Sequence, residues 1–170
     1  MTGQTQDSTR RRFLATVGGG ATLLLSGCMG STGAETETPI PDNTVRMITE
    51  GGAYYFDPIG LHVEPGTTVT FVNASGGHSS TAYPDRIPEG AESWDSTTLT
   101  SQGATYDHTF EVEGTYDYYC IPHKQMGMIG RIVVGDPGGP AEGSMPPDGK
   151  VPKSDRIVDE GAVTYDDYRG

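Results

Sequence analysis

An all-β protein, folded as an antiparallel β-sandwich, is the fold class that this sequence predicts, and three observations lead to it. The chain of 170 residues contains 25 glycines and 12 prolines, which disfavour long helices and require frequent turns. Aromatic and β-branched residues are concentrated in the middle of the chain, as a β core requires. Roughly seven or eight short apolar or alternating segments follow one another there, which is typical of a sandwich.

The first 27 residues predict an export signal. Arg10-Arg11-Arg12-Phe13-Leu14 precedes an apolar run at 15–25 that contains three glycines and is shorter than the ~20 residues needed to cross a bilayer. The arginine pair with the following Phe-Leu resembles a twin-arginine signal. Leu25-Ser26-Gly27-Cys28 resembles a lipobox, in which the cysteine is lipidated and becomes the new N-terminus. We therefore expect a twin-arginine lipoprotein signal peptide at residues 1–27 and a lipid on Cys28.

A tether and the first strands are expected next. The segment 28–43 is rich in Gly, Thr, Glu and Pro and is expected to be a flexible, lipid-anchored tether. Strands are expected at 45–48 and 61–63, the second ended by the turn Glu64-Pro65-Gly66. At 68–72 threonine alternates with apolar residues, so that Val69 and Phe71 share one face of a strand. These segments begin a folded domain that is expected to extend from residue 44 to residue 135.

The second half of the domain contains the longest interruption of the strand pattern. A strand is expected at 78–83, after a glycine-rich turn, and residues 84–103 are expected to be irregular and anchored by Trp94. The segments 105–112 and 115–119 are predicted to form a hairpin across Glu113-Gly114. A strand at 131–134 ends the domain.

Residues 136–170 form the C-terminal tail, which begins with a segment rich in proline and glycine. A short helical turn could begin at a Ser154 cap, run through Glu160 and end at Gly161. Some apolar side chains of the tail could dock on the domain, or the tail could stay disordered: Ile157, Val158, Val163 and Tyr165. No function is assigned to the tail, and it is expected to be flexible.

The residues that bear chemistry gather in one segment, Cys120-Ile121-Pro122-His123-Lys124-Gln125-Met126-Gly127-Met128. Its thiolate, imidazole and thioether, together with His78 after two glycines, provide the donor set His, Cys, His and Met. Thiolate and thioether favour Cu(I) while imidazole also accepts Cu(II), so the set suits a copper ion that changes between the two states. His62 and His108 are expected to be structural, although a supporting role near the ligands stays open for His108.

These motifs resemble a known family. Asn73-Ala74-Ser75-Gly76-Gly77-His78, Tyr118-Tyr119-Cys120-Ile121-Pro122-His123 and Gly127-Met128-Ile129-Gly130 are similar to small blue copper proteins of the plastocyanin and pseudoazurin type, among them the halocyanins, the membrane-attached form from halophilic archaea. The resemblance covers residues 44–135. It implies a Greek-key, cupredoxin-like sandwich with flexible N- and C-terminal segments, and one type 1 copper ion held by His78, Cys120, His123 and Met128.

Two details of the resemblance leave alternatives open. The plastocyanin and pseudoazurin branches place the axial methionine five residues beyond the histidine, which favours Met128, whereas a branch with a shorter loop would use Met126. Ser79 stands where plastocyanins have asparagine, so the side-chain part of the usual support for the ligands is in question. The backbone N–H of Ser79 could still reach the sulfur.

The resemblance implies a one-electron carrier and not an enzyme. A copper oxidase would need further His-x-His pairs, which the sequence lacks, and a structural zinc site prefers four strong ligands. The alternative is copper delivery or storage, although such proteins usually expose methionine-rich or Cys-x2-Cys sites. The expected partners are redox proteins of a membrane electron-transport chain. The protein is then expected outside the cytoplasm, anchored through the lipid on Cys28 to the outer face of the cell membrane.

The charge balance narrows the choice of partners. Eleven basic residues oppose 23 acidic ones, and the resulting net charge of −12 would repel nucleic acid. Acidic residues are spread along the chain and lysine is scarce, which favours a protein that stays soluble in concentrated salt over an ordinary acidic extracytoplasmic protein. Cys28 and Cys120 each have a separate assignment, so no disulfide is expected. We expect the protein to be a monomer.

Overall fold

The computed structural model describes residues 42–170. The predicted signal peptide, the lipidation site Cys28 and almost all of the tether at 28–43 lie outside these residues. Within the described range, no helix combines the length and the apolar character that crossing a membrane requires.

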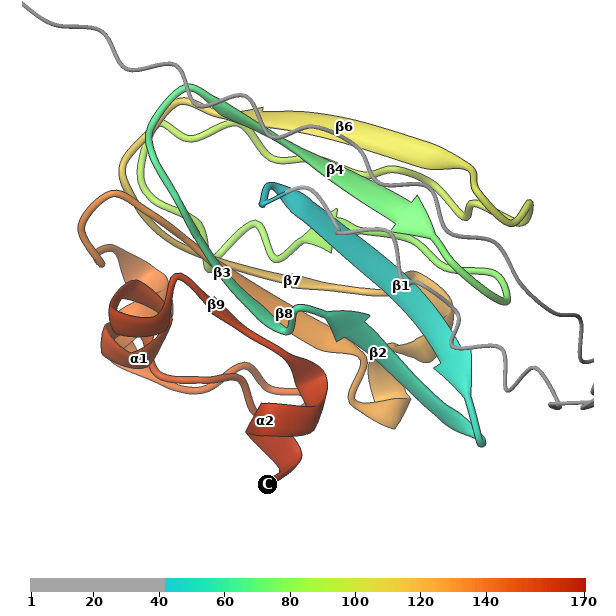
Figure 1. Ribbon diagram of the computed structural model, residues 1–170. Coiled ribbons are helices and arrows are strands. Elements are labelled where there is room, and N and C mark those ends of the chain that lie inside the picture. Colours follow the sequence, from blue (N-terminus) through green and yellow to red (C-terminus); the bar gives the residue numbers. More distant parts are fainter. Residues whose placement is uncertain (1–41) are drawn as a thin grey trace, which may run out of the picture. The chain divides into compact units, whose positions relative to one another are not determined.

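Two β-sheets lie face to face (Figure 1). The first sheet has the strand order β2 (Ala53–Asp57), β1 (Thr44–Glu50), β4 (Thr67–Asn73) and β6 (Thr105–Phe110). The second has the order β5 (Thr81–Ala82), β7 (Gly114–Tyr119), β8 (Ile129–Val134), β3 (Gly60–Val63) and β9 (Ala162–Val163). The predicted all-β sandwich is therefore confirmed.

Both sheets are mixed, so the expected antiparallel pairing holds for every strand pair except two. β1 pairs with β4 in parallel, and β3 pairs with β8 in parallel. The cause is the path of the chain, which leaves the first sheet after β2, passes through β3 in the second sheet and returns as β4. A strand that returns over such a crossover can lie beside β1 in the same direction, which a tight hairpin does not allow.

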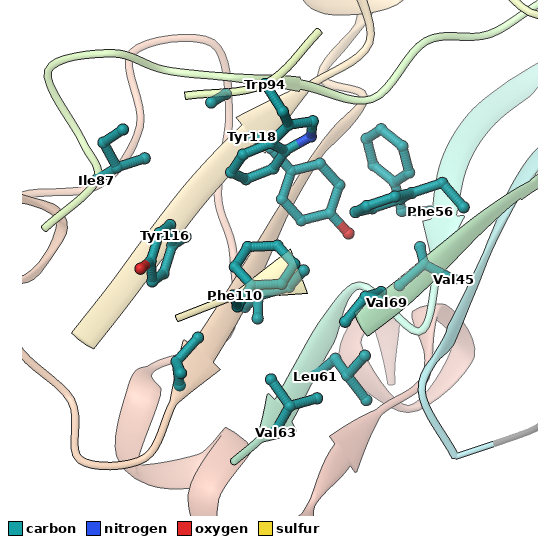
Figure 2. Close-up of a cluster of buried hydrophobic side chains, with 14 of the residues drawn as sticks. Val45, Phe56, Leu61, Val63, Val69, Ile87, Trp94, Phe110, Tyr116 and Tyr118 are labelled. Atoms are coloured by element: carbon teal, nitrogen blue, oxygen red, sulfur yellow. The ribbon is translucent and has the colours of Figure 1, made fainter. Parts of the chain in front are cut away.

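The core lies between the sheets and is formed by side chains that alternate along the strands. Val69 and Phe71 both point inward from β4, as predicted, and they meet Tyr116 and Tyr118 from β7 in one buried cluster. Figure 2 shows the side chains of this cluster directed toward one another. The irregular segment before β6 is anchored by Trp94, as expected, because its indole ring is buried in the same cluster.

β6 and β7 do not form a hairpin, so that prediction was wrong. β6 pairs with β4 in the first sheet, whereas β7 pairs with β5 and β8 in the second. Residues 111–113 carry the chain from one sheet to the other, and the Tyr116 hydroxyl donates to the Val112 carbonyl at this corner. Gly114 begins β7 with a φ of 133°, and a Cβ there would lie 2.7 Å from the Pro88 side chain. Glu113-Gly114 thus marks a corner between sheets and not a two-residue turn.

Strand β2 was absent from the sequence prediction. It forms a hairpin with β1, in which Glu50 pairs with Ala53 across a turn made by Gly51 and Gly52. The two glycines have φ values of 57° and 85°, which a two-residue turn of this kind needs. The signal that could have revealed the strand is therefore the Gly-Gly pair followed by Ala-Tyr-Tyr-Phe.

The C-terminal segment, residues 136–170, is folded onto the sandwich, which corrects the expectation of a flexible tail. It contains the 3₁₀ turn η2 (Pro140–Gly143), helix α1 (Ser154–Glu160), strand β9 and helix α2 (Tyr165–Arg169). Ile157 and Val163 are completely buried against Ile59 and Val133, and β9 extends the second sheet by pairing with β3 (Figure 1). The tail docks because its apolar residues find an uncovered face of this sheet.

The end of α1 was predicted correctly, but the helix begins one residue earlier than predicted. Gly161 ends the helix with a φ of 75°, as its position after the helical residues suggested. Ser154 is the first helical residue and not the cap, which is Lys153. The Ser154 hydroxyl is buried and donates to the Glu142 carboxylate.

Candidate metal centre

Three of the predicted ligands meet at one end of the sandwich. His78 lies between β4 and β5, Cys120 directly follows β7, and His123 lies in the 3₁₀ segment η1 (Ile121–Met126). The Cys120 Sγ is 3.6 Å from His78 Nδ1 and 3.4 Å from His123 Nδ1, and the two nitrogens are 3.2 Å apart. The centre of such a triangle lies about 2 Å from each corner, and metal bonds to imidazole nitrogen and thiolate sulfur measure about 2.0–2.3 Å, with zinc as the example. The three donors therefore fit a single metal ion.

His78 is held by the turn that follows β4. Its Nε2 lies 2.8 Å from the Ser75 carbonyl oxygen and 3.0 Å from Thr49 Oγ1. Because a carbonyl only accepts, Nε2 carries the proton, and the lone pair of Nδ1 is left facing the sulfur. Gly76 has a φ of 84°, and a Cβ there would lie 2.5 Å from Thr49 Oγ1 and 3.2 Å from His78 Nε2. Gly76, two residues before the histidine, is thus required by both backbone conformation and space.

Cys120 is completely buried and its position is set by both flanking strands. Its N–H donates to the Met128 carbonyl at 3.0 Å, which closes the ligand loop between β7 and β8. The Ser79 N–H lies 3.4 Å from the sulfur, as the sequence allowed. The Ser79 hydroxyl accepts a hydrogen bond from the Ile121 N–H at 2.8 Å. The serine side chain therefore supports the start of the ligand loop, at the position where plastocyanins have asparagine.

His123 differs from the other two donors because it is only partly buried. Tyr54 of β2 stacks on its imidazole, with ring centroids 3.9 Å apart and an interplanar angle of 16°. This contact was not foreseen, because β2 itself was not predicted. The loop that carries His123 ends at Gly127, which has a φ of 81° and donates its N–H to carbonyls of the loop.

The two methionines of the loop differ sharply in exposure. Met128 is 0 % exposed and belongs to the same buried cluster as Cys120, whereas Met126 is 59 % exposed. Spacing predicts Met128 as the fourth ligand, and that assignment stays a prediction.

In the metal-free protein, burial changes the pKa of the three titratable donors, the two imidazoles and the thiol. It lowers the pKa of the His78 and His123 imidazoles, and for His78 the neighbouring His123 lowers it further. Both imidazoles are therefore neutral near pH 7, with lone pairs available to a metal. Burial raises the pKa of the Cys120 thiol, so a metal that binds there must displace the thiol proton.

The other two histidines have structural contacts. His62 Nε2 lies 3.0 Å from the Gly135 carbonyl oxygen, so its ring is hydrogen-bonded to the backbone that follows β8. His108 packs on Trp94 and Phe110, with centroids 4.8 Å away from each. The structural assignment of both residues agrees with these contacts.

Known proteins are similar to this chain in sequence. The model of the family described as copper binding proteins, plastocyanin/azurin family, matches residues 43–135. A halocyanin from Natronomonas pharaonis is 30 % identical over 167 residues, which cover 76 % of this chain and 99 % of the halocyanin. A plastocyanin from Scenedesmus fuscus is 36 % identical over 97 residues, which cover 55 % of this chain and 99 % of the plastocyanin.

Solved structures give the same result for the fold. A pseudoazurin from Sinorhizobium superposes with a TM-score of 0.52 and 33 % identity, covering 69 % of this chain and 90 % of the pseudoazurin. A pseudoazurin from Methylobacterium extorquens AM1 gives a TM-score of 0.52 and 27 % identity, covering 69 % and 94 % of the two chains. The predicted resemblance is confirmed at the level of both sequence and fold.

Proposed function

This chain belongs to the plastocyanin/azurin family of copper-binding proteins, and from that premise we propose that it is a one-electron carrier with a single type 1 copper site. The observation that carries the proposal is the triangle of two imidazole nitrogens and one thiolate sulfur, with sides of 3.2 to 3.6 Å. A copper ion bound there supplies the change between Cu(I) and Cu(II), one electron at a time.

His78, Cys120 and His123 would hold the ion, and we propose Met128 as the fourth ligand. The assignment is supported by the complete burial of Met128 in the cluster that contains Cys120. Met126, at 59 % exposure, has most of its side chain in solvent. The donor set is then one thiolate, two imidazoles and one thioether, which serves both oxidation states.

The protein contributes rigidity to this site. The His78 ring is fixed through Nε2, the Cys120 sulfur receives the Ser79 N–H, and the first residues of the ligand loop are held by the Ser79 hydroxyl. A site whose ligands are already held by hydrogen bonds moves little when its charge changes. Little reorganisation then opposes electron transfer, which suits a carrier.

Electrons are proposed to enter and leave at His123, the one partly exposed donor. Its loop presents Ile121, 47 % exposed, and Met126, 59 % exposed, on the surface. Exposed apolar side chains next to a reactive group favour docking of a protein partner, and flexible methionine can adapt to more than one. The proposed partners are redox proteins of a membrane electron-transport chain.

The proposed location is the outer face of the cell membrane. Its support is the order of three sequence features: the Arg10-Arg11 pair, the short apolar run and Cys28. Lysine in place of both arginines should block export, and Cys28→Ser should leave exported protein soluble. Cell fractionation and intact mass measure both effects, and membrane-bound mature protein with an unmodified Cys28 would contradict the anchor.

Voltammetry of the purified copper-loaded protein tests the function. A carrier should give a reversible one-electron wave and keep its copper in the presence of a weak chelator, because His78 and Cys120 are completely buried. Copper delivery or storage predicts the opposite, with ready exchange of the metal and no reversible wave. The second result would overturn the carrier proposal in favour of delivery or storage.

A further inference from the structure

His123 is held in a different way from the two buried donors. His78 is fixed by hydrogen bonds from its own ring to Ser75 and Thr49, whereas His123 depends on the loop that carries it and on the stacked ring of Tyr54. The C-terminal segment contacts the loop through Asp148 and the strand that carries Tyr54 through Tyr165. We propose that this segment, at residues 136–170, positions His123 by bracing its loop on one side and its stacking partner on the other. The inference rests on the proposed copper site.

The first brace acts on the ligand loop through Asp148. Lys124, the residue after His123, places Nζ 3.5 Å from the Asp148 carboxylate and over the rings of Tyr119 and Tyr83, at 4.2 and 4.7 Å from their centroids. The Tyr83 hydroxyl donates to the same carboxylate at 2.6 Å. One carboxylate thus joins the loop to a tyrosine of the sandwich. The ammonium group has aromatic faces and a counter-charge around it, so the loop is restrained at its middle.

The backbone of the segment also lies close to the end of the loop. A Cβ on Gly149 would lie 2.9 Å from the Ile129 side chain and 3.5 Å from the Gly127 Cα. A side chain at position 149 would require the Ile129 side chain to move, so glycine allows this close approach without such a shift. At Asp148 and Gly149 the segment therefore contacts both the middle of the ligand loop and the point where this loop continues into β8.

The second brace acts on β2, the strand that carries Tyr54. β2 is an edge strand that pairs with β1, and its other edge has no strand beside it in the described part of the chain. Tyr165 of α2 stacks on Tyr55, with centroids 4.0 Å apart and an angle of 5°. The Tyr165 N–H donates to the Asp57 carboxylate at 2.9 Å. Successive side chains of a strand point to opposite faces of the sheet. The contact of Tyr165 with Tyr55 on one face therefore restrains the backbone that positions Tyr54 on the other face.

The segment can brace other parts because it is itself firmly attached. The buried Asp117 carboxylate pairs with Arg86 at 2.9 Å and with Arg131 at 2.8 Å, and both arginines donate to the Ala141 carbonyl at 3.1 Å. Ile157 fills the space beneath α1 with no exposure. The segment is thus attached to the second sheet at two places: through Ala141 before its contact with Lys124, and through Ile157 between the two braces.

Two substitutions test the braces in the full-length protein, each with a matched control. Tyr165→Leu removes the stack on Tyr55. The control Tyr168→Leu alters a tyrosine of the same helix that, like Tyr165, packs against the buried cluster of Ile157 and Val163 but does not stack on Tyr55. Asp148→Ala removes the link to Lys124, and Asp159→Ala removes an exposed carboxylate of α1 that lies outside the metal centre. Both controls measure how a substitution elsewhere in the segment affects His123 when neither brace is removed.

The main readout is the NMR shift of the His123 ring protons in the metal-free protein, because the stacked Tyr54 ring shields them. Both test variants should shift these signals downfield and leave the His78 ring protons unchanged. Cu(II) affinity, measured by competition with a chelator, should fall roughly two- to tenfold, the loss expected for one aromatic pair. The controls should leave the His123 signals and the affinity unchanged.

Three results would overturn the braces: unchanged His123 signals in both test variants, equal changes in the controls, or equal changes at His78 and His123. The metal-free measurement keeps the two proposals apart. If the unmodified protein failed to bind copper with the colour of thiolate-to-copper charge transfer, the proposed function would fail, whereas the NMR shifts would still decide the role of the segment.

Discussion

The two halves of the metal centre use the same kind of donor in opposite surroundings. In the half that contains His78 the imidazole is completely buried, its Nε2 is held by the Ser75 carbonyl and the Thr49 hydroxyl, and Gly76 has no room for even a methyl group. The half that contains His123 is a short loop near solvent, held by an aromatic stack and by side chains from distant parts of the chain. The comparison teaches that one side fixes the geometry of the site, while the other is the side at which we propose that partners dock.

The largest effect is expected where the two halves meet, at the sulfur. Cys120→Ser replaces the thiolate by a hydroxyl of nearly the same shape, so the fold should be kept while the soft donor is lost. The protein should lose its intense colour and its reversible redox wave entirely. Visible spectroscopy and voltammetry measure this, and a variant that stayed intensely coloured would show that the sulfur is not a ligand.

The next effect concerns the buried half alone. Gly76→Ala should destabilise the protein by about 1–3 kcal/mol through the backbone conformation, and by more through the contact with Thr49 and His78. It should also lower copper affinity because the imidazole must move. Gly52→Ala is the matched control, since Gly52 has nearly the same φ of 85° but nothing within 4 Å of its added Cβ. Equal unfolding energies for the two variants would contradict the tight fit around His78.

The two methionines sharpen the comparison within one loop. Met128→Leu should change the reduction potential and the visible spectrum, because it removes the proposed axial donor with little change in volume. Met126→Leu should leave both nearly unchanged, since that side chain is mostly in solvent. A larger spectral change in the Met126 variant would reverse the assignment and favour the shorter ligand spacing.

The smallest expected effect is confined to the exposed half and appears only in kinetics. Met126→Glu should slow electron exchange with a redox partner severalfold in 1 M salt, without changing the spectrum. Charges act over only about 3 Å under those conditions, so apolar contact should govern docking. Stopped-flow reduction measures the rate.

The control for this prediction reverses remote charges. Glu64 precedes the start of β4 and Glu111 follows β6, at the opposite end of the sandwich from His78, and both are exposed. Lysine at both positions should change the exchange rate less than Met126→Glu does. The reverse ranking would mean that charge governs docking even in concentrated salt.

What the sequence could predict, like the two halves of the metal centre, divides into features set by local sequence and features set by distant contacts. The sandwich, the buried residues of β4 and the three close donors could be predicted, because alternation of side chains and ligand spacing are local properties of the sequence. The path of the chain from one sheet to the other could not be predicted. Glu113-Gly114 satisfies the rule for a hairpin turn, yet β6 finds a better partner in β4, which lies far away in the sequence.

The contacts around His123 were missed for a related reason. Tyr54, Asp148 and Tyr165 approach the site or its supports from segments that are distant in sequence, and no local pattern marks them. The C-terminal segment was undecided for the same cause: its apolar residues are too few to define a fold alone and are ordered only by the sheet that they cover. The signal peptide and the lipid on Cys28 stay predictions.

The buried charge cluster at Asp117 limits when the domain can fold relative to its synthesis. Arg86 and Arg131 are shielded by a carbonyl of residue 141 and by the segment around it, so neither can be buried until that part of the chain has left the ribosome. β3 likewise needs β8 and β9, which are made much later. The native domain therefore cannot assemble strand by strand during synthesis, and it must form from a nearly complete chain. Such a chain suits transport after folding, which is the route that the twin-arginine motif at Arg10-Arg11 predicts.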